Sequence, residues 1–272
     1  MRQRIITGTV LAIALGLLVY FGEGQLEFLF SGTCVVLSTI AAFEFIRMTR
    51  NPEKLRWFDW VAVLFTISFS VISVIFFDRM VTYYIIVFAF LLVILLVYAL
   101  LFVSIKDFIA KDFGNQILTI FYTSLGFIAF AYLRKESMTL IIYLFLIAML
   151  TDVFAYFVGI KFGKHRLAVN ISPKKSVEGA IGGLIIGSLL ATTFAWFFQV
   201  FSYGFFTILL FSAGLSIISQ VGDLIASKFK REYGIKDYSQ LFPGHGGVLD
   251  RFDSSMFAAI FLMLAVMMNI IS

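Results

Sequence analysis

The chain has 272 residues, of which 61% are hydrophobic and 14% are charged, and its formal net charge is +5. Soluble domains carry about 25% charged residues, so this composition excludes an ordinary soluble domain. Several apolar runs approach the length of about 20 residues that a helix needs to cross a bilayer, and they lack the alternation of barrel strands. The sequence therefore predicts an all-α, polytopic integral membrane protein.

Nine apolar segments can be interpreted as transmembrane helices. They are Ile5–Phe21, Leu26–Ile46, Trp57–Phe77, Val81–Val103, Ile117–Tyr132, Met138–Ile160, Gly179–Phe201, Phe205–Ala226 and Met256–Ile271. We interpret the first segment as a retained span because no small-x-small cleavage site follows it. Residues 1–135 would form an N-terminal region of five spans, and residues 136–272 a catalytic region of four spans with two cytosolic loops.

The basic residues fall almost entirely on one side of this nine-span arrangement. Every Lys and Arg except Arg79, Arg134 and Lys135 lies in connections on the same side. The positive-inside rule makes that side cytosolic, with the N-terminus inside and the C-terminus outside. The positive net charge thus reports membrane topology, and we predict no binding of nucleic acid.

Acidic residues inside apolar segments are the first sign of chemistry. Asp152 and Asp223 lie within the sixth and eighth spans, and Glu44 is a polar exception in the first half of the chain. An ionised carboxylate in a span costs a few kcal/mol, so it needs a partner or a polar cavity. The sequence alone leaves open a pairing between helices.

A metal site is the second interpretation of these acids. Asp250 and Asp253 follow at a spacing that places both on one helix face, although either acid could instead cap that helix. Cys34 is the only cysteine, so a cysteine-based metal site and an intramolecular disulfide are not expected. Carboxylates suit a hard cation such as Mg²⁺.

Two further segments could bind anions. Lys174 and Lys175 precede small residues that enter a helix, and a helix N-terminus with nearby lysines can hold phosphate. The spacing is not that of a P-loop, and paired lysines beside a membrane also serve as a topology or lipid signal. His245, Gly246 and Gly247 could supply a proton donor and a backbone nest for phosphate. The glycines at 179, 182, 183 and 187 are typical of close helix packing.

These segments together resemble a known enzyme family. The matching positions are Ser227, Phe229-Lys230-Arg231, Lys236-Asp237, Ser239, Phe242-Pro243, His245-Gly246-Gly247-Val248 and Asp250-Arg251-Phe252-Asp253. Their spacing resembles the signature of the phosphatidate cytidylyltransferases, also called CDP-diacylglycerol synthases. The block Ser172-Pro173-Lys174-Lys175-Ser176-x-Glu178-Gly179 is similar to a second stretch of that family, with Ser176 and Val177 in place of the more usual Thr and Trp. The resemblance covers about Asp152 to Asp253.

The resemblance implies a nucleotidyltransferase of phospholipid biosynthesis that converts CTP and phosphatidate to CDP-diacylglycerol and pyrophosphate. Its partners would be CTP, phosphatidate and the cell membrane, with the active site facing the cytosol. A homodimer is one candidate assembly. The cofactor would be Mg²⁺, with one or two cations in the site.

Our hypothesis assigns the candidate residues to three groups. The catalytic group is Lys174, Lys175, His245 and Arg251. The substrate-binding group is Ser172, Ser176, Glu178, Lys230, Arg231, Lys236, Gly246 and Gly247. The metal-binding group is Asp152, Asp223, Asp250 and Asp253.

Two other functions remain open at this point. A CTP-dependent polyprenol or phytol kinase would use similar charges but transfer the γ-phosphoryl group to an alcohol. An ion-coupled secondary transporter would use the intramembrane aspartates, although no internal repeat of the usual kind is present. The CDP-alcohol phosphotransferases are excluded because their DxxDG…GxxxDxxxD spacing is missing.

Overall fold

The computed structural model describes the chain apart from residues 1, 22–25, 51–52 and 272. The described residues form nine helices and one hairpin of two strands. In chain order these are α1 (Arg2–Phe21), α2 (Glu27–Arg50), α3 (Trp57–Phe76), α4 (Met80–Ser104), α5 (Ala110–Glu136), α6 (Met138–Phe162), β1 (Arg166–Ala168), β2 (Ser172–Ser176), α7 (Val177–Phe197), α8 (Phe205–Glu232) and α9 (Leu249–Met267). The predicted all-α membrane class is confirmed.

Seven of the described helices, α2 to α8, are long and apolar enough to cross a membrane. In α1 the apolar stretch is shorter, over Gly8–Phe21. In α9 the first two turns carry three charged residues, Asp250, Arg251 and Asp253. The nine helices lie where nine spans were predicted, while the number that span the bilayer and their orientation stay predictions.

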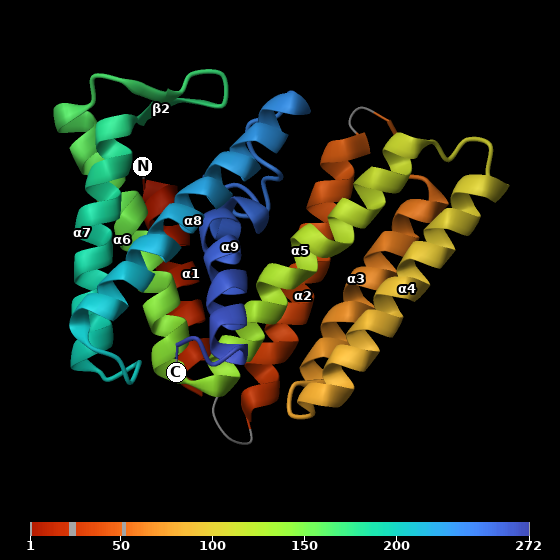
Figure 1. Ribbon diagram of the computed structural model, residues 1–272. Helices are drawn as coiled ribbons and strands as arrows, with labels where there is room; N and C mark the ends of the chain where they lie inside the picture. Colours follow the sequence, from red (N-terminus) through yellow and green to blue (C-terminus); the bar gives the residue numbers. More distant parts are fainter. Residues whose placement is uncertain (1, 22–25, 51–52, 272) are drawn as a thin grey trace.

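The helices run up and down in a bundle with α5 at its centre (Figure 1). Along its length α5 packs against α2, α3 and α9, while α6 pairs with α7 and α8 with α9. One continuous apolar core contains residues of α2, α5, α6, α8 and α9, and a smaller one lies between α3, α4 and α5. The division into two regions at residue 135 stays a prediction.

Two predicted boundaries were wrong by about two turns. The fifth helix was expected over Ile117–Tyr132, but α5 begins at Ala110, where the Asp112 carboxylate accepts a hydrogen bond of 3.1 Å from the N–H of Ile109. The ninth was expected to begin at Met256, but α9 begins at Leu249. Both extensions carry acids, because carboxylates are favourable in the first turn of a helix.

Close packing of α7 on α6 depends on glycine. A Cβ atom at Gly183 would lie 2.5 Å from the carbonyl oxygen of Thr151, and one at Gly187 would lie 2.9 Å from the Thr151 nitrogen. The backbones can therefore approach only without side chains at these positions, as the small-residue spacing predicted. This contact holds the turn of α6 that carries Asp152.

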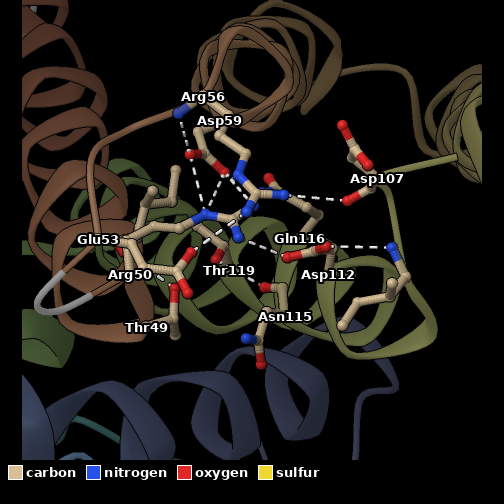
Figure 2. A network of polar contacts seen from close by, with 12 residues as sticks. Thr49, Arg50, Glu53, Arg56, Asp59, Asp107, Asp112, Asn115, Gln116 and Thr119 are labelled. Carbon is tan, nitrogen blue, oxygen red and sulfur yellow. Dashed lines mark hydrogen bonds and ion pairs between the residues drawn. The ribbon is translucent and has the colours of Figure 1, made fainter. Parts of the chain in front are cut away.

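A buried polar network ties together one end of α2, α3 and α5 (Figure 2). Arg50 is 8% exposed and Asp59 is 2% exposed. The Arg50 guanidinium binds Asp59 at 2.9 and 3.0 Å and Asp112 at 2.5 Å, while Gln116 donates to Asp59 at 2.5 Å. From the sequence, Arg50 is only one of the basic residues that indicate the cytosolic side. The network fixes the C-terminal end of α2.

Candidate active site

The segment from Tyr233 to Val248, which we call the signature loop, connects α8 to α9 on the side of the bundle where α2 ends and α5 begins. Asp250, in the first turn of α9, holds this loop. Its Oδ1 binds Lys230 Nζ at 2.8 Å, and its Oδ2 accepts hydrogen bonds from the N–H groups of Tyr238 (2.8 Å) and Gly247 (2.9 Å). Asp250 thus organises the loop, and its expected part in metal binding stays a prediction.

Lys230 and Tyr238 form the inner wall of the loop. Lys230 is buried, and its Nζ lies 3.9 Å from Asp253 and 5.2 Å from the centre of the Tyr238 ring. Burial raises the pKa of the Tyr238 hydroxyl above its ordinary value, and the protonated hydroxyl donates to the carbonyl of Ala226 at 3.3 Å. In this arrangement Lys230 neutralises two acids, and its expected role in substrate binding stays a prediction.

Three predicted metal ligands from three different helices lie near one another. Asp152, on α6, accepts a hydrogen bond of 3.2 Å from the hydroxyl of Ser254, the residue after Asp253 on α9. Asp223, on α8, is close enough to Asp152 and to Asp253 to interact with both electrostatically. We call these three acids the acid cluster. The structure thus brings residues 152, 223 and 253 together, and their part in metal binding stays a prediction.

A lysine from the hairpin balances the acid cluster. Lys175, on β2, forms an ion pair with Asp223, which also accepts a hydrogen bond of 3.3 Å from Ser227. Within the described residues, no three His, Cys, Asp or Glu side chains converge closely enough to form a metal-ligand set as they stand. A cation would therefore combine one or two of these carboxylates with oxygens of a substrate, which is the usual arrangement for Mg²⁺.

The β1–β2 hairpin was expected only as a basic loop. Two predicted substrate-binding residues hold its end against α7. Ser176 caps α7 by accepting from the N–H of Gly179 at 3.1 Å, and Glu178 accepts from the N–H groups of Lys164 and His165 at 3.1 and 3.2 Å. Glu178 also binds the His165 ring at 2.6 Å. These contacts place the lysines of β2, because they fix where the strand ends.

Of the other predicted site residues near the hairpin, some make contacts and one is exposed to solvent. Ser172 pairs with Ala168 at the turn end of the hairpin, and Lys174 is exposed. Arg231, at the end of α8, donates to the carbonyls of Ile171 and Ile235, both at 3.3 Å. Arg231 thus connects the hairpin to the signature loop, and its role toward a substrate stays a prediction.

A cavity of about 400 Å³ opens in the signature loop. Its lining combines three groups that can carry positive charge with loop backbone, and consists of Lys236, Asp237, Gln240, Phe242, Pro243, Gly244, His245, Gly246 and Arg251. The φ angles of Gly244 and Gly246 are +77° and +82°, a backbone conformation that favours glycine. The cavity fits an anionic ligand better than an apolar one.

His245 lies between this cavity and the first helix. A Cβ atom at Gly8 would lie 3.1 Å from its Nε2, and its buried Nδ1 has no hydrogen-bond partner within the described part of the chain. A buried ring nitrogen without a partner is unfavourable unless a ligand or a proton transfer uses it. The geometry is compatible with the proton-donor role assigned to His245, which stays a prediction.

Comparison with known proteins supplies the identity. The model of the cytidylyltransferase family matches residues 2–269, almost the whole chain.

The chain belongs to the cytidylyltransferase family.

Three relatives in this family carry the name phosphatidate cytidylyltransferase. The protein from Staphylococcus haemolyticus is 44% identical over 164 residues, which are 60% of this chain and 62% of the relative. That from Staphylococcus saprophyticus is 42% identical with the same coverage, and that from Staphylococcus aureus strain COL is 42% identical over 154 residues, 57% of this chain and 59% of the relative. The matched part of the chain thus spans about three fifths of the length of these relatives.

Sequence reasoning missed one residue of this cytidylyltransferase site. Glu44, on α2, lies outside the resemblance, yet its carboxylate contacts the signature loop at Ser239, near its middle, and at Val248, its last residue. The only signal for it in the sequence was a charged residue in an apolar span. Its partners lie about 200 positions away, so no local pattern could identify them.

Proposed function

We propose that this protein transfers the cytidylyl group of CTP to phosphatidate, forming CDP-diacylglycerol and releasing pyrophosphate. The observation that carries the proposal is the meeting of the acid cluster and Lys175 beside a loop with a cationic cavity. Membership of the cytidylyltransferase family and relatives named phosphatidate cytidylyltransferase support the choice of nucleotide and lipid.

The reaction requires little proton transfer. A phosphate oxygen of phosphatidate attacks the α-phosphorus of CTP, the bond between the α-phosphorus and the bridging oxygen breaks, and pyrophosphate leaves with that electron pair. The attacking oxygen is already anionic, so no strong general base is needed. The main barrier is the approach of two polyanions, which positive charge must offset.

The residues of this chain would supply that charge from two directions. Lys175, and the exposed Lys174 beside it, would face the reacting phosphates from the hairpin. Lys236 and Arg251 would bind the triphosphate in the cavity of the signature loop. His245 would donate a proton to the departing pyrophosphate through a ring nitrogen. Lys175 is already held by its ion pair with Asp223, so its placement costs little reorganisation.

A divalent cation such as Mg²⁺ fits the donor set of the acid cluster, which offers carboxylates flanked by the hydroxyls of Ser227 and Ser254. One or two of Asp152, Asp223 and Asp253 would hold it together with oxygens of the substrate, and when bound it would neutralise phosphate charge.

The membrane face of the site is part of the proposal. The hairpin follows α6 and the signature loop joins α8 to α9. The hairpin contacts the acid cluster through Lys175, and Lys230, beside the signature loop, lies 3.9 Å from Asp253. The basic connections of the chain are predicted to lie on this side. The positive-inside rule makes this side cytosolic. CTP would then enter from the cytosol, and phosphatidate would enter from the inner leaflet of the cell membrane.

Product analysis tests the proposal. Purified protein is incubated with phosphatidate, Mg²⁺ and CTP labelled in either the α- or the γ-phosphate, and the lipids are extracted. We expect label in the lipid only from α-labelled CTP and release of labelled pyrophosphate from γ-labelled CTP. Transfer of the γ-label to an added polyprenol or phytol would instead support a lipid kinase. Absence of any lipid product, together with ion-driven solute flux in liposomes, would support a transporter.

A further inference from the structure

Glu44 is a buried carboxylate that no cation neutralises within the described part of the chain. It lies on α2 and is 3% exposed. Its Oε1 accepts from Ser239 Oγ at 2.6 Å and from the N–H of Val248 at 3.0 Å, and its Oε2 accepts from the N–H of Leu249 at 3.0 Å. Hydrogen bonds to an ionised acceptor are about twice as strong as neutral ones.

Two of these donors belong to the start of α9. The first N–H groups of a helix have no partner within the helix, and a nearby negative charge interacts favourably with that end. Val248, at the N-cap position of α9, has no side-chain oxygen and makes no capping bond. Glu44 therefore caps α9 from a different helix, where most helices use a residue of their own chain segment.

The contacts of Glu44 flank the central part of the cavity lining, from Gln240 to Gly246. Ser239 lies before this segment and Val248 after it, so one carboxylate holds both of its sides. Gly247, directly after the segment, packs so closely that a methyl group there would collide with the Glu44 carboxylate. The next turn of α2, with Arg47 and Met48, lines a second cavity of about 390 Å³ together with Ser239.

We propose that Glu44 is a positioning residue for nucleotide binding. It binds Ser239 before His245, and Val248 and Leu249 between His245 and Arg251, and so sets the separation of His245 and Arg251 across the cavity. The inference rests on the proposed function and adds to it a residue of the N-terminal helices that acts without touching the substrate. We expect its effect on the CTP site, because its hydrogen bonds are to the signature loop and the start of α9 and none is to the acid cluster or the hairpin.

The decisive variant is Glu44→Gln, which keeps the size of the side chain and replaces one accepting oxygen by a donor. An N–H group at the start of α9 then faces another donor, and the loop loses one of its hydrogen bonds to residue 44. We expect the KM for CTP to rise about tenfold or more, the range that follows from loss of a charged hydrogen bond. The KM for phosphatidate should stay within about twofold. An unchanged KM for CTP in folded Glu44→Gln protein would overturn the proposal, as would an equal rise for both substrates.

Two further variants separate positioning from general stability. Asp59→Asn is the matched control, because Asp59 is also a buried acid beside the end of α2 with three side-chain donors, but it does not contact the signature loop. It should lower the yield of folded protein and leave the KM for CTP unchanged. Ser239→Ala removes one of the three bonds to Glu44 and should raise the KM for CTP by less than Glu44→Gln. A rise in Asp59→Asn as large as that in Glu44→Gln would reduce Glu44 to a structural role and overturn the proposal.

Hydrogen exchange gives a readout that does not depend on turnover. In Glu44→Gln the amides of Val248 and Leu249 should exchange faster than in the unchanged protein, while those in the middle of α9 keep their protection. If the unchanged protein made no CDP-lipid but this local exchange difference was present, the proposed function would fail, while the positioning of the loop by Glu44 would be supported. Equal exchange at Val248 and Leu249 in both proteins would overturn the positioning role of Glu44 itself.

Discussion

Asp223 carries a negative charge within α8, and the ammonium group of Lys175 balances it from the hairpin. In the proposed reaction between two polyanions, a carboxylate in this position would hold a cation and place Lys175 at the same time. Its replacement by an uncharged amide removes both effects and leaves the shape of the side chain.

We predict that Asp223→Asn lowers kcat/KM for CDP-lipid formation by about 100-fold or more, the effect of losing one preorganised electrostatic contact. Turnover of labelled CTP by equal amounts of folded protein measures it. Asp107→Asn is the control, because Asp107 is an exposed acid in a connection away from the acid cluster. Near-normal activity of Asp223→Asn would remove Asp223 from the catalytic site.

Substitution by alanine is informative at only one of the two glycines that follow His245. Gly246 has a φ of +82°, so alanine is strained there whatever the backbone contacts, and a lost activity would not distinguish a phosphate nest from a plain turn. At Gly247 the nearest atoms that a Cβ would meet belong to the Glu44 carboxylate. Activity lost in Gly247→Ala should therefore return in part when Glu44 is also shortened to Asp, because the collision is relieved.

At the scale of elements, the arginine network at the end of α2 is the main polar contact among the first five helices (Figure 2). Arg50 contacts acids of α3 and α5, so one guanidinium connects three helices. The removal of one partner from a buried ion pair leaves the other charge without compensation, which is costly.

We predict that Asp59→Asn destabilises the protein by about 3–5 kcal/mol, the usual cost of breaking a buried pair. Thermal unfolding in detergent, followed by the loss of folded protein on a sizing column, measures the difference. Glu53→Gln is the comparison, because the 3.3 Å pair of Glu53 with Arg56 is largely exposed, and exposed pairs contribute about 0–1 kcal/mol. Similar unfolding temperatures for both variants would show that the network adds little to stability.

The α6–α7 contact has a consequence for the acid cluster. Gly183 touches the backbone at Thr151, the residue before Asp152. We predict that Gly183→Val costs about 1–3 kcal/mol of stability, as overpacking does, and lowers activity further because α6 is pushed away and moves Asp152. Gly214→Val is the control, since no atom lies within contact distance of a Cβ there. Full activity in Gly183→Val would show that the position of Asp152 does not depend on this contact.

The elements themselves were largely predictable from the sequence, for reasons that particular residues show. Long apolar runs indicated nine helices, and the glycines of α7 indicated close packing. The starts of α5 and α9 were misplaced because Asp112, Asp250 and Asp253 made these turns look like loop. The β1–β2 hairpin was missed because its strands are short and basic, so the alternating pattern of a strand is absent.

At the scale of the whole molecule, orientation in the membrane is a prediction that rests on charge alone. We expect Lys106→Cys to lie in the cytosol and Ser202→Cys outside, because the connections that hold them are on opposite sides of the predicted topology. Both positions are exposed in the structure, and the natural Cys34 is buried. A maleimide reagent that cannot cross membranes should label only Ser202→Cys in intact cells and both variants after lysis. Labelling of Lys106→Cys alone in intact cells would show that the predicted orientation is wrong.

The candidate site was predictable where its residues lie in one stretch and unpredictable where it joins distant ones. Asp152, Asp223 and Asp253 were recognised as charges that need a partner, and the structure gives them one another and Lys175. The sequence could not assign Asp250 to the loop backbone, since that role depends on how the loop turns. Nor could it connect Glu44 to Leu249, because such a contact is set by the packing of the complete bundle.

The capping of α9 by Glu44 also constrains biogenesis. A ribosome makes α2 long before α9, since the two hydrogen-bonded residues are separated by 205 positions. During that interval the carboxylate of Glu44 has entered the bilayer without its final hydrogen-bond donors, so α2 should remain near the insertion machinery or a temporary polar neighbour until α9 is made. Release of the folded enzyme would then coincide with the arrival of α9, and chains interrupted before that point would be targets for membrane proteases.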